Sequence, residues 1–133
     1  MERKELYEAI EQKFRSSVPE VKHIALWNHN VEYIEEEQAW ERPAVFVEFG
    51  QIDWRIMTNN SYRGSGRIRL HVVTDWSGEA PFSLTDKITA AVDGLEGERF
   101  GGMSLVATYT NHNHEELVES IEELVVKYLR LAE

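Results

Sequence analysis

Cysteine is absent from this 133-residue sequence, and proline occurs only three times. Without cysteine the chain can form no disulfide, thiolate nucleophile, iron–sulfur cluster or cysteine-ligated zinc site. No apolar run approaches the roughly 20 residues that a membrane-spanning helix needs. The charged segment Glu2-Arg3-Lys4-Glu5 is not followed by the apolar stretch of a secretory signal. These absences predict a cytoplasmic protein that does not enter a membrane.

Positive charge is also scarce in the sequence. Lysine and arginine together number 14, against 24 aspartates and glutamates, so the formal net charge is −10. Affinity for nucleic acids and for anionic membrane surfaces comes largely from cationic side chains. The charge balance therefore predicts that neither a nucleic acid nor a membrane is a partner of this protein.

The rest of the composition is that of an ordinary globular domain. Hydrophobic residues make up 42% of the chain and aromatic residues 11%, which is enough for a core without cross-links or metals. At this length we expect the chain to form one domain over residues 1–133.

Two segments have the apolar spacing of amphipathic helices. In residues 3–16 the apolar side chains recur every four positions, and acidic residues occupy the first turns. The second helix is expected to begin near Ser83, which has the spacing of a capping box with Asp86. Gly94 is the expected C-cap of this second helix.

Alternation of apolar and polar residues predicts strands along the middle of the chain. The expected strands cover residues 21–27, 44–49, 51–56, 67–75 and 103–109, and residues 51–56 are either a separate strand or a bent continuation of 44–49. Residues 58–66 are rich in asparagine, serine and glycine, which predicts a long hairpin loop. In the strand that follows this loop, Arg67, Arg69 and His71 are expected to face solvent. This order of elements predicts an α+β fold with a mainly antiparallel sheet and helices packed on one face.

The C-terminal segment, residues 117–131, has two interpretations. Its apolar residues fit a helical repeat of 3.6 residues, which favours a helix. Val125 and Val126 could instead form the centre of a strand, because β-branched residues are common in strands. The periodicity alone favours the helix.

His112 and His114 are the most suggestive chemical pair in the chain. Side chains two positions apart point to the same side of an extended segment, and Glu115 or Glu116 could complete the ligand set of a metal. The alternative, which we favour, is a polar turn that caps the next element. We therefore predict no catalytic residue, no metal site and no cofactor.

Tryptophan and arginine suggest a surface for protein partners. Both residue types are enriched at interface hot spots, and each tryptophan of this chain lies near an expected strand end or loop. The alternative is that the tryptophans form the rim of the core. The candidate interface residues are Trp40, Arg42, Trp54, Arg55, Asn59, Tyr62, Arg63 and Trp76.

Three segments together resemble one family of proteins. They are Pro43–Gly50, the strand Ile68–Asp75, and Ile88–Leu95, in which a helix ends in the turn Asp-Gly-Leu. With a leading helix and closing strands, this arrangement resembles the tail-terminator or tail-completion proteins of tailed bacteriophages, minor tail proteins that prophages also encode.

The resemblance implies a structural role in virion assembly. It implies a homo-oligomer, typically a hexameric ring, that caps the tail tube and offers a surface to the head connector. The partners would then be tail-tube and head-connector proteins, first in the host cytoplasm and then in the virion tail. It further implies that the loop at residues 58–66 contacts a neighbouring subunit or the tube, and that the chain closes with a strand.

Two other functions compete with this one. The chain could be a monomeric protein-binding adaptor that uses its tryptophan-bearing loops. It could also be a small metal-dependent hydrolase that uses His112 and His114, which the sequence favours less than the adaptor.

Overall fold

The computed structural model describes residues 1–28, 41–75, 80–111 and 117–131. The elements are α1 (Glu2–Ser17), β1 (His23–Leu26), β2 (Ala44–Ile56), the short 3₁₀ turn η2 (Thr58–Asn60), β3 (Tyr62–Asp75), α3 (Ala80–Val92), β4 (Phe100–Asn111) and β5 (Leu117–Arg130). The five strands form one sheet in the order β1-β2-β3-β5-β4. Only β1 and β2 are parallel, and the other pairs are antiparallel. The predicted α+β class with a mainly antiparallel sheet is confirmed.

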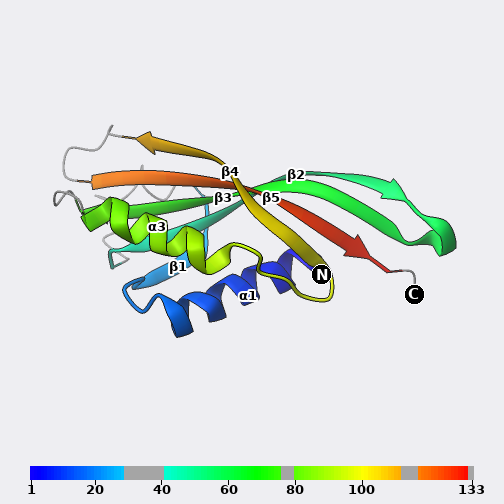
Figure 1. Cartoon of the computed structure of the whole chain (residues 1–133), viewed down its shortest axis with the longest axis horizontal. Coiled ribbons are helices and arrows are strands. Elements are labelled where there is room, and N and C mark those ends of the chain that lie inside the picture. Colours follow the sequence, from blue (N-terminus) through cyan, green and yellow to red (C-terminus); the bar gives the residue numbers. More distant parts are fainter. Residues whose placement is uncertain (29–40, 76–79, 112–116, 132–133) are drawn as a thin grey trace.

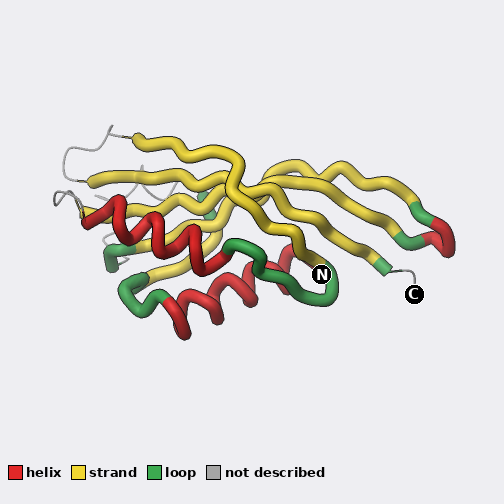
Figure 2. The backbone as a smooth tube through the Cα atoms, viewed as in Figure 1, coloured by secondary structure: helices red, strands yellow, loops and turns green. Residues whose placement is uncertain are grey.

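Both helices cover the same face of the sheet, which we call the helix face (Figures 1 and 2). The expected stripe of α1 is buried there, and the helix ends where the Val18 amide donates to the Phe14 carbonyl, one residue before Pro19. The core between helices and sheet contains Leu6, Ile10, Phe14, Val45, Val47, Ile68, Leu70, Val72, Ile88, Val92, Leu124 and Val126. Alternate residues of each central strand supply it, as a period of two requires.

The expected start of the second helix is wrong. Helix α3 begins at Ala80, so Ser83 lies inside the helix and is not its N-cap. Pro81 is tolerated here because the first turn of a helix needs no backbone N–H donor. The expected end is confirmed, since Gly94 has a left-handed φ of 72° directly after the helix.

Most of the expected hairpin loop is strand. Only η2 and its flanking residues turn the chain, with Asn59 and Asn60 at positive φ, and β3 already begins at Tyr62. Gly64 pairs with Trp54 and Gly66 with Ile52. A Cβ on Gly64 would lie 2.8 Å from the Ile52 side chain and 2.9 Å from the Trp54 ring. These glycines therefore provide close approach within a strand pair, and the long loop was the wrong interpretation.

The helix that periodicity favours for residues 117–131 is also wrong, and the strand implied by the family resemblance is confirmed. Leu117–Arg130 forms β5, which pairs with β3 along its whole length on one side and with β4 from Glu119 to Tyr128 on the other. Because β5 is an inner strand, side chains on both of its faces are buried. Apolar residues on both faces break the alternation of a strand and give a pattern that also fits a helical repeat.

Strands β2, β3 and β5 extend beyond the helices (Figure 1). We define the arm as residues 50–69 and 124–131, which comprise this projection and the stretch where it leaves the core, with Ile68, Leu124 and Val126. None of the described helices is long and apolar enough to cross a membrane.

Candidate interaction surfaces

The arm brings together five of the predicted interface residues. Trp54 and Arg55 lie on β2, Asn59 lies in the turn, and Tyr62 and Arg63 begin β3. The pairings of Trp54 with Gly64, Arg55 with Arg63 and Ile56 with Tyr62 place them side by side.

The other three predicted residues are not part of this group. Arg42 lies two residues before β2, and its Nε donates to the Asp75 carboxylate at 2.7 Å. That pair links the beginning of β2 to the end of β3 and lies outside the arm. Trp40 and Trp76 lie outside the described residues.

Trp54 is held against the core at the base of the arm. Its ring centroid lies 6.3 Å from that of Tyr128, and the Arg130 guanidinium lies 4.5 Å from the ring centroid. Burial raises the pKa of Tyr128 to about 12. The rim-of-core interpretation therefore describes Trp54, whose large ring joins the arm to the main core.

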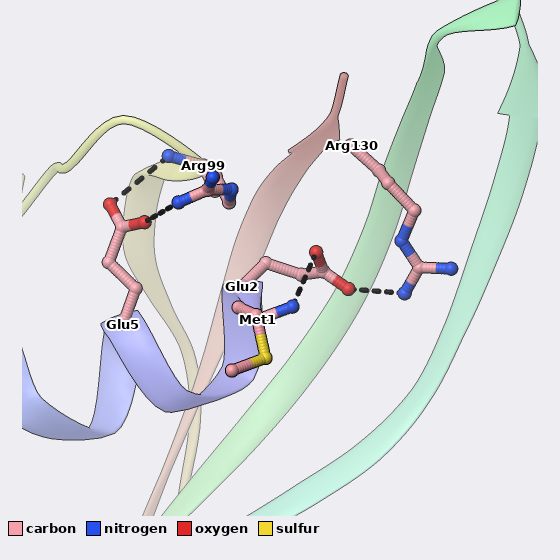
Figure 3. A network of polar contacts seen from close by, with 5 residues as sticks. All are labelled: Met1, Glu2, Glu5, Arg99 and Arg130. Carbon is pink, nitrogen blue, oxygen red and sulfur yellow. Dashed lines mark hydrogen bonds and ion pairs between the residues drawn. The ribbon is translucent and has the colours of Figure 1, made fainter. Parts of the chain in front are cut away.

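Two ion pairs tie the first turn of α1 to the sheet (Figure 3). Glu2, whose side chain is 3% exposed, accepts a hydrogen bond from Arg130 at the end of β5. That bond holds the pKa of Glu2 at about 2, against an ordinary value of 4.5, although burial acts in the opposite direction. Glu5 accepts from the Arg99 guanidinium at 3.3 Å. The arm is therefore attached to helix α1 through Glu2, Arg130 and Trp54.

The tip of the arm exposes apolar side chains. Ile56 is 60% exposed, Met57 37% and Tyr62 38%. Sequence reasoning named Tyr62 but missed Ile56 and Met57. The sequence contained a signal for Ile56, because Ile56 continues the alternation of Ile52 and Trp54. Those two side chains are partly buried, whereas Ile56 is exposed.

The arm is cationic in an otherwise acidic chain. Six of the 14 basic residues and only one of the 24 acidic residues lie in it, which gives the arm a formal charge of +5 and leaves −15 for the rest of the chain. Three of these six basic residues, Arg67, Arg69 and Arg130, pair with Glu123 or Glu2 outside the arm. The other three still outnumber the single acidic residue, and an excess of one sign favours oriented encounters.

His71 was expected to face solvent, but it is buried. It is 4% exposed on the face of the sheet opposite the helices. Its Nε2 lies 2.7 Å from a Glu48 oxygen and its Nδ1 2.7 Å from a Glu119 oxygen. The Trp27 ring stacks on the imidazole at 3.7 Å. Sequence reasoning missed this cluster because its members come from four different strands or strand ends.

Arg67 and Arg69 point away from the core, as predicted, on the same face as His71. Both donate to the Glu123 carboxylate, at 3.0 Å and 2.8 Å, and the pKa of Glu123 is lowered mainly by the bond from Arg69. Paired charges on neighbouring strands stabilise the register of β3 against β5.

Strand β4 forms one border of the sheet (Figure 1). Its twelve residues include no charged residue and no proline, whereas 29% of the chain is charged. Leu105, Val106 and Tyr109 are 43–46% exposed on it. Natural edge strands are usually protected by charge, proline or bulges. This border has neither charge nor proline, but its pairing with β5 is irregular between Gly101 and Ser104 and between Leu105 and Ala107.

The metal hypothesis concerns residues outside the described part of the chain. His112 and His114 both lie there. Among the residues that the structure describes, no group of three or more histidine, cysteine, aspartate or glutamate side chains could hold a metal ion.

The fold is similar to that of a known particle protein. No family model matches the sequence, and no curated protein matches it. Among solved structures, the chain is similar to a chain in the virion of a native gene transfer agent (GTA) particle, with a TM-score of 0.65 and 10% sequence identity. The similarity covers 93% of this chain and 94% of that chain, so the two share a fold over nearly their whole length.

Proposed function

We propose that this chain is a structural protein of a tailed phage or prophage, folded as one domain over residues 1–133. In this proposal it forms a ring, most simply a hexamer, that caps the tail tube and joins it to the head connector. It assembles in the cytoplasm of the bacterial host and ends in the virion tail. The role is that of an assembly protein, and no catalytic residue is assigned.

One observation carries the proposal: the fold is shared, end to end, with a chain from the virion of a gene transfer agent particle. The segments that resemble tail-terminator proteins, Pro43–Gly50 and Ile68–Asp75, form the adjacent central strands β2 and β3 of that fold. A projecting arm and an edge strand without charged residues are features that suit a protomer of a larger assembly.

The test begins with the purified chain. Light scattering on a size-exclusion column, over a wide concentration range, should give the mass of a closed oligomer, and negative-stain images should show annuli. If the chain is monomeric, it is mixed with the tail-tube protein encoded beside it, and rings should then appear at tube ends. A chain that stays monomeric and does not bind tubes would refute the proposal.

A monomeric protein-binding adaptor is the second candidate, and the exposed apolar tip at Ile56, Met57 and Tyr62 favours it. The same scattering experiment separates the two functions. An adaptor remains a monomer and binds a partner in a one-to-one complex, and substitution of Ile56 by aspartate should abolish that complex.

The hydrolase alternative depends on a bound metal. Its test is the melting temperature with and without EDTA, together with metal content by mass spectrometry. We expect the melting temperature and the metal content to be the same in the parent and in the double variant His112→Ala and His114→Ala. A large EDTA-induced fall that this double variant no longer shows would revive the metal hypothesis.

A further inference from the structure

The sheet has a second open edge besides β4. Strand β1 pairs with β2 only from Ala44 to Val47, and the Trp27 amide adds one bond to the Val47 carbonyl. Beyond that point, Ile52–Ile56 pairs with β3 on one side, and no described strand lies on its other side. The outer edge of β2 in the arm therefore presents backbone donors and acceptors at the opposite border from β4.

These two edges have compatible directions. β2 is antiparallel to β3, β3 to β5, and β5 to β4, so β2 and β4 run in opposite directions. If a second copy continues the sheet in the same orientation, its β2 meets β4 of the first copy in antiparallel pairing. Antiparallel pairing is the more stable arrangement per residue.

Charge distinguishes this contact from a symmetric one. Pairing β4 of one copy with β4 of another would bring together two regions that each carry a share of the −15 outside the arm. Pairing β4 with the arm instead brings a region of +5 against that acidic region. Strand β4 itself carries no charge that would oppose either contact.

We propose that the outer edge of β2 in the arm of one copy pairs with β4 of a second copy, so that the sheets continue head to tail. Such a contact uses a different surface on each copy and can close into a ring. The inference rests on the proposed function in one respect, since it assigns the interface through which that ring forms. Leu105, Val106 and Tyr109 become covered in the contact.

The absence of cysteine allows a direct test by cross-linking. One cysteine is placed on the arm, at Asp53 or Arg55, and one on β4, at Val106 or Tyr109. All four combinations are oxidised, with the tail-tube protein and without it. Any intermolecular register that brings the two edges together should give a ladder of dimers, trimers and larger species in at least one double variant. Each single-cysteine variant should give dimers at most.

The outcomes separate this inference from the proposed function. If the protein forms rings by light scattering or on tubes, but no double variant gives a ladder, the interface is overturned and the ring stands. If Val106→Cys alone is driven to dimers and the double variants give nothing larger, the contact is symmetric and the inference is overturned. If no oligomer forms under any condition, both proposals are overturned.

A lysine on the edge provides a second measurement. Val106→Lys, at a side chain that is 46% exposed, should leave the melting temperature nearly unchanged and raise the dissociation constant of the oligomer by about tenfold or more. Phe82→Lys is the matched control, because Phe82 is 40% exposed on helix α3, away from both edges of the sheet. An equal effect of both variants, or no effect of Val106→Lys, would overturn the assigned edge.

Discussion

Replacement of Glu2 by glutamine removes the charge that ties α1 to the arm and keeps the size of the side chain. In the structure the Glu2 carboxylate is buried and accepts from Arg130, whose guanidinium also lies over the Trp54 ring. The variant should therefore weaken the attachment of the arm to the helix layer without opening a cavity.

The magnitude follows from the pKa of Glu2. A fall from 4.5 to about 2, at about 1.4 kcal/mol per pKa unit, sets an upper limit of roughly 3 kcal/mol. Because the Arg130 side chain is 52% exposed, water and salt screen the pair, and we expect about 1–2 kcal/mol. A lowered pKa stabilises the folded state above pH 4.5, and that stability is lost as the pH falls from 4.5 toward 2.

Urea unfolding followed by tryptophan fluorescence measures this contribution. Glu2→Gln should lower the free energy of unfolding at neutral pH, and the difference from the unmodified protein should vanish near pH 2. Glu8→Gln is the matched control, since Glu8 lies on the same helix with a side chain that is 55% exposed. A Glu2→Gln variant as stable as the parent at neutral pH, or a difference that persists unchanged in acid, would refute the reasoning.

Three further substitutions test the packing. Gly64→Ala should cost about 1–3 kcal/mol in thermal unfolding, because the added Cβ meets side chains closer than 3.0 Å. Gly101→Ala, with its nearest neighbour at 3.6 Å, should cost much less, and an equal loss would contradict the crowding. Leu70→Ala should cost about 2–5 kcal/mol because its side chain is fully buried in the core; a loss as small as that of Leu131→Ala on the surface would show that the site is not core. His71→Phe should cost about 1–3 kcal/mol in urea unfolding, since the ring still stacks but the contacts of the two ring nitrogens with Glu48 and Glu119 are lost. An unchanged midpoint for His71→Phe would mean that those carboxylates are hydrated in solution.

The sequence alone determined the parts of this protein that depend on local chemistry. The stripe of α1 was sufficient because the helix buries a single set of side chains. The alternation in Ala44–Phe49 and Arg67–Asp75 predicted strands, although part of each strand is buried on both faces. The fold class followed from the order of those elements.

Tertiary structure alone decided the features that depend on which residues lie on a neighbouring strand. β5 is a strand because it fills an inner position between β3 and β4, and burial on both sides made its pattern look helical. Gly64 looks like a turn residue until the Trp54 ring is seen across the pair. His71 is buried only because Glu48, Glu119 and Trp27 converge on it from distant parts of the chain. The periodicity of a strand shows which of its own residues share a face. It does not show which residues of a distant strand lie beside them, because that depends on the register of pairing.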